Sequence, residues 1–129
     1  MEDFLYRAVI PLNPKTKKNN QEILYKYAGG KRIPFISQSK TYKQYEKDAG
    51  WFLTKPTTPI DYPVNIKCIF YRQTFVRCDL TNLLEAIDDI LVKYGVIADD
   101  NFNIIAAHDG SRVYVDKEKP RTEIYITKL

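Results

Sequence analysis

The segment 79–101 gathers carboxylates that could together bind a metal ion: Asp79, Glu85, Asp88, Asp89, Asp99 and Asp100. Only one base, Lys93, accompanies these six acids, so the segment has a charge of −5 in a chain whose net charge is +4. The rest of the chain therefore carries +9. An acidic cluster in a basic protein suits an enzyme that acts on a polyanion through bound cations, although a solvated acidic helix face would explain the charges equally well.

Asp79 and the Asp99-Asp100 pair flank a predicted helix. Asp79 occupies an N-cap position, apolar residues follow at helical spacing, and Gly95 is a natural C-terminal stop. If this helix folds back toward a sheet, the carboxylates converge and repel one another unless Mg²⁺ or Mn²⁺ lies between them. Such a site cleaves phosphodiesters without a histidine. Taken singly, a helix cap and a polar turn are the simpler explanations.

The remaining patterns predict strands and one further helix around this segment. Strands are predicted at 4–10, at 63–73 and at 121–129 from apolar alternation, and hairpins around Gly29-Gly30 and Asp109-Gly110. A helix is predicted over 40–54, with Ser39 as its N-cap. We therefore expect a single α+β domain over residues 1–129, with a mixed sheet packed against two main helices.

Several classes of protein are excluded by composition. At 129 residues the chain has the size of one domain, and no run approaches the roughly 20 apolar residues of a membrane span. The N-terminus lacks the residue order of a secretory signal, so we expect a cytoplasmic protein that does not contact a membrane. Cys68, Cys78 and the single His108 match neither a zinc site nor a disulfide framework, and no serine or cysteine stands at the spacing of a catalytic triad.

The run DLTNLLEAIDDILVKYGVIADDN, residues 79–101, resembles the signature of the RusA family of Holliday-junction resolvases. The segments PKTKKNNQ (14–21) and SKTYKQYE (39–46) resemble the basic loop and first helix of that family, so the resemblance spans most of the chain in order. It implies a RusA-like fold and a homodimeric, magnesium-dependent endonuclease that nicks two strands symmetrically across a four-way DNA junction. Such enzymes are bacterial and commonly encoded by phages or prophages.

The resemblance also implies site residues. Asp79 and Asp100 match the metal-site aspartates of the family, and Asp99 lies beside the second. The family pattern Asp-Leu-Asp-Asn has Thr81 here in place of its second aspartate, and a lysine expected one turn later is Glu85. Because positions 81 and 85 share a helix face, we expect Glu85 to replace the missing ligand. Asp89 matches an acid that the family often has, so the expected metal site is Asp79, Glu85, Asp89, Asp99 and Asp100, with Asp79, Glu85 and Asp100 catalytic.

Basic residues outside the acidic segment are expected to bind the phosphates of branched DNA, although solubility explains any one lysine alone. Phe75, in the turn before Asp79, is expected to be exposed and to wedge into the centre of a junction. The alternatives are a catalytically inactive protein that binds branched DNA, or a metal-dependent nuclease for another branched DNA or for RNA. The expected phosphate contacts are a loop cluster and one side of the first helix: Lys15, Lys17, Lys18, Asn19 and Asn20, and Lys40, Lys43 and Lys47.

Overall fold

Strand β4 (Val64–Arg72) lies inside a five-stranded sheet, where its alternating side chains fill the core. Val64, Ile66, Cys68 and Phe70 are completely buried, whereas the residues between them are only partly buried. This alternation gives the strand one apolar face and one mixed face. The strand predicted within 63–73 is therefore confirmed.

Two antiparallel strands complete one side of the sheet. Strand β7 (Arg121–Lys128) pairs with β4 and places Ile124 opposite Cys68. Strand β1 (Tyr6–Ile10) pairs with the outer edge of β7. Ile124 is completely buried, so the two neighbouring strands contribute to one continuous apolar layer. The strands predicted at 4–10 and 121–129 are confirmed.

The other edge of β4 differs from the sequence prediction. Strands β5 (Ile105–Ala107) and β6 (Arg112–Val115) do not pair with each other: both run parallel to β4, one after the other along its edge. The predicted hairpin around Asp109-Gly110 is therefore wrong. The segment between β5 and β6 bends against β4 instead, and the backbone N–H of Cys68 donates to Ser111 Oγ at 3.0 Å. These contacts together supply partners for backbone groups along most of this edge of β4.

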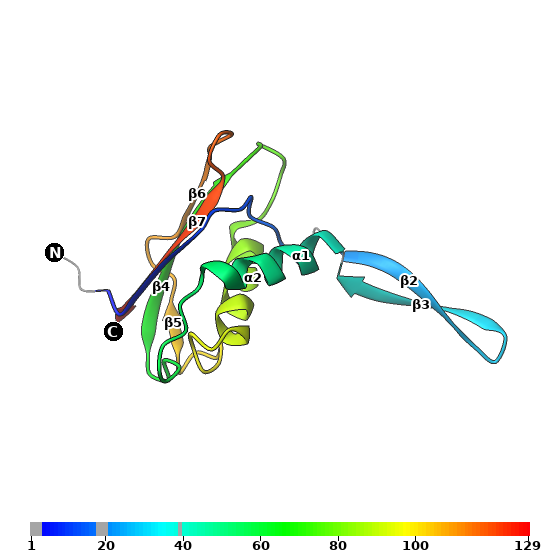
Figure 1. The fold of residues 1–129 in the computed structure, drawn as a ribbon, viewed down its shortest axis with the longest axis horizontal. Coiled ribbons are helices and arrows are strands. Elements are labelled where there is room, and N and C mark those ends of the chain that lie inside the picture. The colour runs from blue at the N-terminus through cyan, green and yellow to red at the C-terminus, as the bar shows by residue number, and fades with distance from the viewer. Residues whose placement is uncertain (1–3, 18–20, 39) are drawn as a thin grey trace.

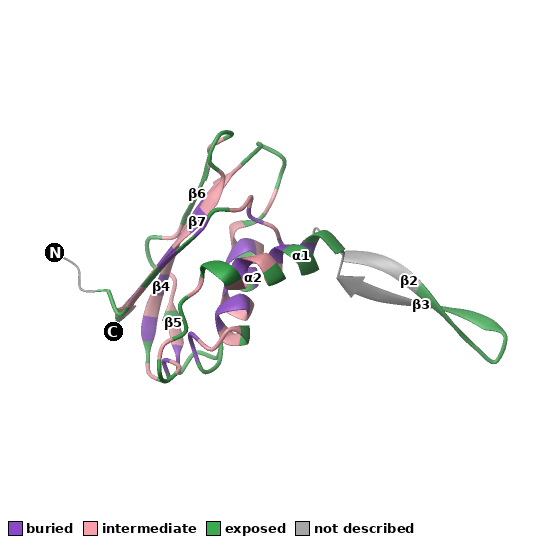
Figure 2. Ribbon diagram, in the orientation of Figure 1, coloured by how far each residue is buried: buried purple, intermediate pink, exposed green. Residues whose placement is uncertain are grey.

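Two helices, α1 (Lys40–Ala49) and α2 (Leu80–Lys93), cover the apolar face of the sheet (Figure 1). Their buried residues, coloured purple on the ribbon in Figure 2, belong to one face of each helix. Helix α1 ends before residue 54, where the sequence predicted its end, and the chain tightens into the 3₁₀ helix η2 (Gly50–Phe52). At Gly50 a Cβ atom would lie 2.4 Å from the ring of Tyr94, so the two helical segments approach closely only because position 50 lacks a side chain.

Strands β2 (Gln21–Ala28) and β3 (Lys31–Gln38) form a separate antiparallel hairpin. Gly29 and Gly30 make the turn, with φ values of 58° and 75° that other residues rarely adopt. Figure 1 shows this hairpin extending away from the five-stranded sheet. The hairpin predicted around Gly29-Gly30 is confirmed.

This computed structural model describes residues 4–17, 21–38 and 40–129, with the backbone alone described at 21–24 and 35–38. In these ranges the chain is a small α+β domain with a mixed sheet and two α-helices, as predicted. Ser39, the predicted N-cap, and the predicted DNA contacts Lys18, Asn19 and Asn20 lie outside the described residues. No helix in the described ranges has the length and apolar character needed to span a membrane.

Candidate functional site

Three of the acids identified in the sequence line one shallow pocket of about 270 Å³ beside helix α2. Glu85 and Asp88 come from the helix, and Asp100 comes from the segment that follows it. The chain returns toward the sheet after Gly95, whose φ of 73° ends the helix, and Ile97 then bridges in parallel to Ile60. The other lining residues are Thr81, Leu84 and His108.

Asp88 contacts His108, for which the sequence predicted no role. The carboxylate Oδ2 of Asp88 lies 2.9 Å from His108 Nε2, and His108 Nδ1 lies 2.8 Å from the carbonyl oxygen of Ile66. Both side chains are mostly buried, with 14% and 24% of their surface exposed. Asp88 therefore turns toward the sheet, and not outward as it would on a solvated acidic helix face.

The two hydrogen bonds of His108 together require a proton between its Nε2 atom and the carboxylate of Asp88. The Ile66 carbonyl can only accept, so Nδ1 is protonated, and the contact between Nε2 and Oδ2 needs a second proton. Burial alone would lower the pKa of His108, but the hydrogen bond and negative charge of Asp88 outweigh burial and raise it. Burial also raises the pKa of Asp88, against the effect of His108. Both raised pKa values favour an Asp88–His108 pair that keeps the shared proton.

The other acids near the pocket differ in their partners. The backbone N–H of Asp100 donates to Asp99 Oδ1 at 2.7 Å, and the Asn101 amide donates to Asp99 Oδ2 at 3.0 Å. These bonds lower the pKa of Asp99. Desolvation, the neighbouring Asp99 and the charge of Asp89 raise the pKa of Asp100. Asp89 itself forms an ion pair with Lys17, from the N-terminal loop.

Asp79 is the N-cap residue of helix α2 but does not cap it with its side chain. Its backbone is extended, with φ of −86° and ψ of 134°, and its carbonyl accepts the N–H of Asn82 and Leu83. The side chain is exposed and is not among those that line the pocket of Glu85 and Asp100. Helix capping by the carboxylate therefore does not explain an aspartate at this position.

The carboxylates do not form a complete metal cage. Among residues 4–17, 21–38 and 40–129, no three His, Cys, Asp or Glu side chains are grouped so that they could hold a metal ion. Glu85 and Asp100 still supply hard oxygen donors at one pocket, and Asp88 Oδ1 is buried there without a hydrogen-bond partner among the described residues. Mg²⁺ usually retains several waters and needs only one or two carboxylates together with substrate phosphates. The donor set at this pocket fits that minimal requirement.

The residues predicted to bind DNA lie on two parts of the described surface. Lys40, Lys43 and Lys47 are exposed on helix α1, whose opposite side buries Tyr42 and Tyr45. Lys15 lines a second pocket, of about 310 Å³, with Arg72 and Cys78 among its other residues. Phe75 is 83% exposed in the loop between β4 and α2.

His108 is the residue of this site that sequence reasoning missed. It is separated by 20 positions from Asp88 and follows β5, a strand whose pairing the sequence predicted wrongly. A single histidine without a nucleophile near it in sequence gave no signal. Comparison of the chain with protein-family models found no match, and comparison with curated proteins found none either.

Proposed function

We propose that this protein is a metal-dependent, structure-selective DNA endonuclease that acts as a homodimer and resolves Holliday junctions by paired symmetric nicks. The observation that carries the proposal is the acidic pocket, where Glu85 and Asp100 lie with Asp88, whose Oδ1 has no hydrogen-bond partner in the part of the chain that the structure describes. Desolvation first, and then the neighbouring Asp99 and Asp89, raise the pKa of Asp100, and a bound cation would oppose all of these effects. The resemblance of residues 79–101 to the RusA signature supports this choice of reaction.

Glu85 and Asp100 would hold the metal ion, with Asp79 and Asp99 reaching it from the two ends of the acidic segment. Mg²⁺ or Mn²⁺ in such a site activates water and stabilises the charge that develops on the phosphate. Asp89 would join the site when Lys17 leaves it. A DNA phosphate offers Lys17 a competing partner, so substrate binding would release Asp89.

The basic residues would hold the DNA backbone without reading its sequence. Lys40, Lys43 and Lys47 present ammonium groups along helix α1, and Lys15 lies near the loop that carries Phe75. Phosphate contacts give little sequence information, so selectivity would come from the shape of the junction and the geometry of the dimer. Phe75 would enter the centre of the junction.

A second candidate is a protein that binds branched DNA without cutting it. Thr81 stands where the family has an aspartate, and no group of three metal ligands occurs in the described residues. These two observations favour loss of catalysis with binding retained. The two candidates differ in one outcome, which is cleavage.

The test is cleavage of a labelled synthetic four-way junction by purified protein in Mg²⁺, Mn²⁺ or EDTA. Matched linear duplex, other branched DNA and RNA serve as alternative substrates. Asp79→Asn and Asp100→Asn should lower cleavage about a hundredfold or more while junction binding and the melting curve are unchanged, because each removes a metal-site charge. Asp61→Asn, an exposed aspartate in the loop before β4, is the matched control and should cut normally.

Paired, metal-dependent nicks confined to the junction would support the resolvase. Nicks on another branched DNA or on RNA would identify that nucleic acid as the substrate, in place of the four-way junction. Tight junction binding without nicks in any metal would favour the second candidate. If Asp79→Asn unfolds the protein, the aspartate is structural and its assignment to the site fails.

A further inference from the structure

The face of the five-stranded sheet opposite the helices carries aromatic and cationic side chains. The inward residues of β4 and β7 are buried against the helices, whereas the outward residues remain partly exposed. Figure 1 shows α1 and α2 on one side of the sheet, and no helix in the described ranges covers the other side. Tyr71, Tyr114 and Tyr125 project from this open face on three different strands.

The first aromatic group crosses three neighbouring strands in register. Tyr71 of β4 lies opposite Arg121 of β7 on one side and opposite Tyr114 of β6 on the other. The guanidinium carbon of Arg121 is 3.7 Å from the centroid of the Tyr71 ring. The rings of Tyr71 and Tyr114 are stacked, with centroids 5.5 Å apart and planes 23° apart. Tyr114, at the edge of the sheet, is 46% exposed and ends the stack.

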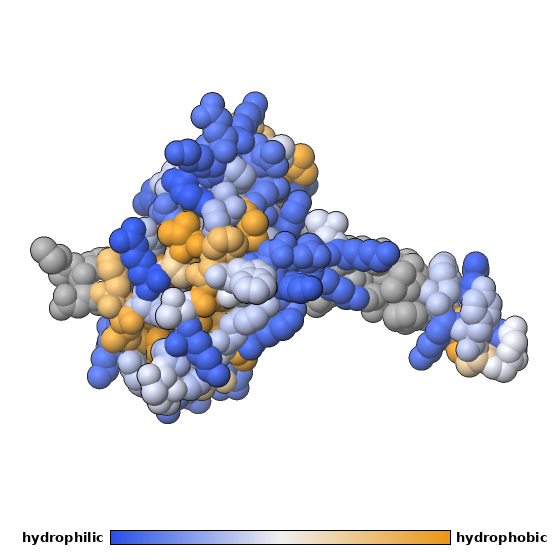
Figure 3. Space-filling view, viewed as in Figure 1, coloured by the Kyte–Doolittle hydropathy of each residue, from blue (hydrophilic) through white to orange (hydrophobic). Residues whose placement is uncertain are grey.

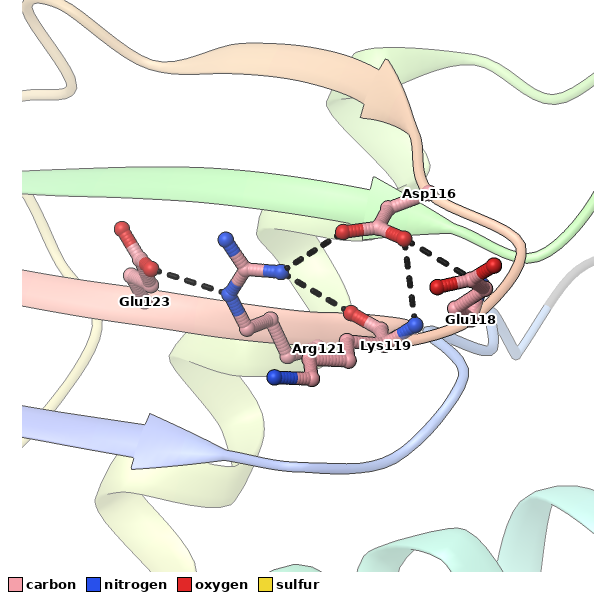
Figure 4. Close-up of polar contacts among 5 residues, drawn as sticks. All are labelled: Asp116, Glu118, Lys119, Arg121 and Glu123. Atoms are coloured by element: carbon pink, nitrogen blue, oxygen red, sulfur yellow. Dashed lines mark hydrogen bonds and ion pairs between the residues drawn. The ribbon is translucent and has the colours of Figure 1, made fainter.

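Arg121 is held in place by a network of its own (Figure 4). Its guanidinium donates to Asp116 Oδ2 at 3.1 Å, to the Lys119 carbonyl at 2.9 Å and to Glu123 Oε2 at 3.0 Å. Asp116 Oδ1 in turn accepts the backbone N–H groups of Glu118 and Lys119. The stack on Tyr71 is therefore ordered before any ligand arrives, which lowers the entropy lost on binding.

A second aromatic group lies further along the same face. The Phe4 and Tyr125 rings have centroids 5.1 Å apart, and both line a pocket of about 270 Å³. Arg7 Cζ lies 5.5 Å and Lys67 Nζ 5.0 Å from the centroid of Tyr125. Tyr125 is four residues along β7 from Arg121, so the two groups are about 13 Å apart. An extended chain molecule could contact both.

The charges on this face select the ligand. The outward-facing strand positions include one acidic residue, Glu123. They also include four cations: Arg7, Lys67, Arg112 and Arg121. Glu123 is already engaged by Arg121 and by the Tyr125 hydroxyl, and Asp109 and Asp116 lie in the turns at the border. A second copy docking through the same face would bring like charges together. Exposed aromatic rings among cations suit unpaired bases and phosphates.

We propose that the open face of the sheet binds single-stranded nucleic acid, with bases stacked on Tyr114 and Tyr125 and phosphates held by Arg7, Lys67 and Arg112. This site lies on the side of the sheet opposite the acidic pocket, and binding there needs no metal. In Figure 3, hydrophilic side chains dominate the end of the sheet where β6 and β7 join. Stacking without hydrogen bonds to base edges makes the site tolerant of sequence.

The experiment measures fluorescence anisotropy of labelled oligonucleotides, dT and rU of about 12 nucleotides, in EDTA. Tyr114→Ala should bind about tenfold more weakly, and Tyr114→Phe, which keeps the ring, should bind normally. Val113→Ala is the matched control, because Val113 is the next residue on β6, points to the other face and is 38% exposed. Arg112→Gln should reduce the slope of log affinity against log salt by about one.

The inference is supported if oligonucleotide binding is weakened by Tyr114→Ala but not by Tyr114→Phe or Val113→Ala. Absence of oligonucleotide binding, or equal binding by Tyr114→Ala and the parent, overturns it. If Tyr114→Ala instead dissociates a dimer in sedimentation and leaves oligonucleotide affinity unchanged, the face is a contact between copies. The assay contains EDTA and no cleavable junction, so a failure of junction cleavage would leave this result unaffected.

Discussion

The contact between Asp88 and His108 should make the stability of the protein depend on pH. His108→Ala removes the hydrogen bonds to Ile66 and to Asp88, and neither oxygen of the mostly buried Asp88 carboxylate then has a partner among the residues that the structure describes. A hydrogen bond to a charged group contributes about 1.5–3 kcal/mol, and an unsatisfied buried group costs a similar amount. We therefore expect His108→Ala to lower the free energy of unfolding by about 2–3 kcal/mol near pH 6.

The sign of the pH dependence follows from the raised pKa of His108. A group whose pKa is higher in the folded protein contributes stability that is fully present below its unfolded pKa, here the ordinary histidine value of 6.5. That contribution is lost as pH rises through the folded pKa. Burial raises the pKa of Asp88 as well, so its own contribution begins to decline at lower pH, above the ordinary aspartate value of 3.8, and the loss above pH 6.5 is assigned to His108. The parent protein should therefore lose stability above about pH 6.5, and His108→Ala should lose less.

The measurement is urea unfolding followed by far-UV circular dichroism at several pH values between about 6 and 9. At the low end of this range the midpoint of His108→Ala should lie about 1 M below that of the parent. Asp88→Asn is the informative companion, because its amide can donate to an unprotonated Nε2 while Nδ1 remains bonded to Ile66. That variant keeps a hydrogen bond without a titrating proton, so its stability should change little across the range.

Two results would refute this reasoning. If His108→Ala costs the same free energy at both ends of the pH range, the proton between the side chains does not stabilise the fold. If Asp88→Asn retains the pH dependence of the parent, the dependence arises from another group. A far-UV spectrum identical to that of the parent is required for either comparison.

Two further predictions concern packing and thiol chemistry. Gly50→Ala should lower the melting temperature by about 5 °C or more, because its Cβ would lie 2.4 Å from the ring of Tyr94, whose hydroxyl is held by the Glu46 carbonyl at 2.8 Å. An unchanged melting temperature, measured by circular dichroism, would mean that the ring moves aside freely. With Ellman's reagent, Cys78 should react in the folded protein and Cys68 only after unfolding, because burial excludes the reagent and raises the pKa of the Cys68 thiol. Equal reaction rates of the two thiols would contradict the buried position of Cys68.

The sequence by itself determined the elements whose evidence is local. Alternation at Val64, Ile66, Cys68 and Phe70 specifies a strand with one buried face, and strand β4 has that face. Helical spacing of apolar residues between Asp79 and Gly95 specifies helix α2. In each case the periodicity of the side chains matches the geometry of the element, so no distant residue was needed to predict it.

Only the tertiary structure decided how the segments after α2 pair. Asp109-Gly110 suits a hairpin turn, and Gly110 does adopt a positive φ of 85°, but the same conformation serves a bend along the edge of β4. The bend is stabilised by hydrogen bonds to residues of β4, which lie some 40 residues earlier in the chain. A local pattern carries no information about them.

The candidate site divides in the same way. The sequence identified the acids and the helix that carries most of them, and its resemblance to a resolvase signature supplied their expected roles. The fold decided that Glu85 and Asp100 share a pocket, that Lys17 pairs with Asp89 and that Asp88 turns inward to His108. Composition and periodicity identify which residues are charged and which side of the helix is apolar, but they did not show that Asp88 turns inward. The partner of each charge depends on contacts between residues far apart in the chain, and these exist only once the chain has folded.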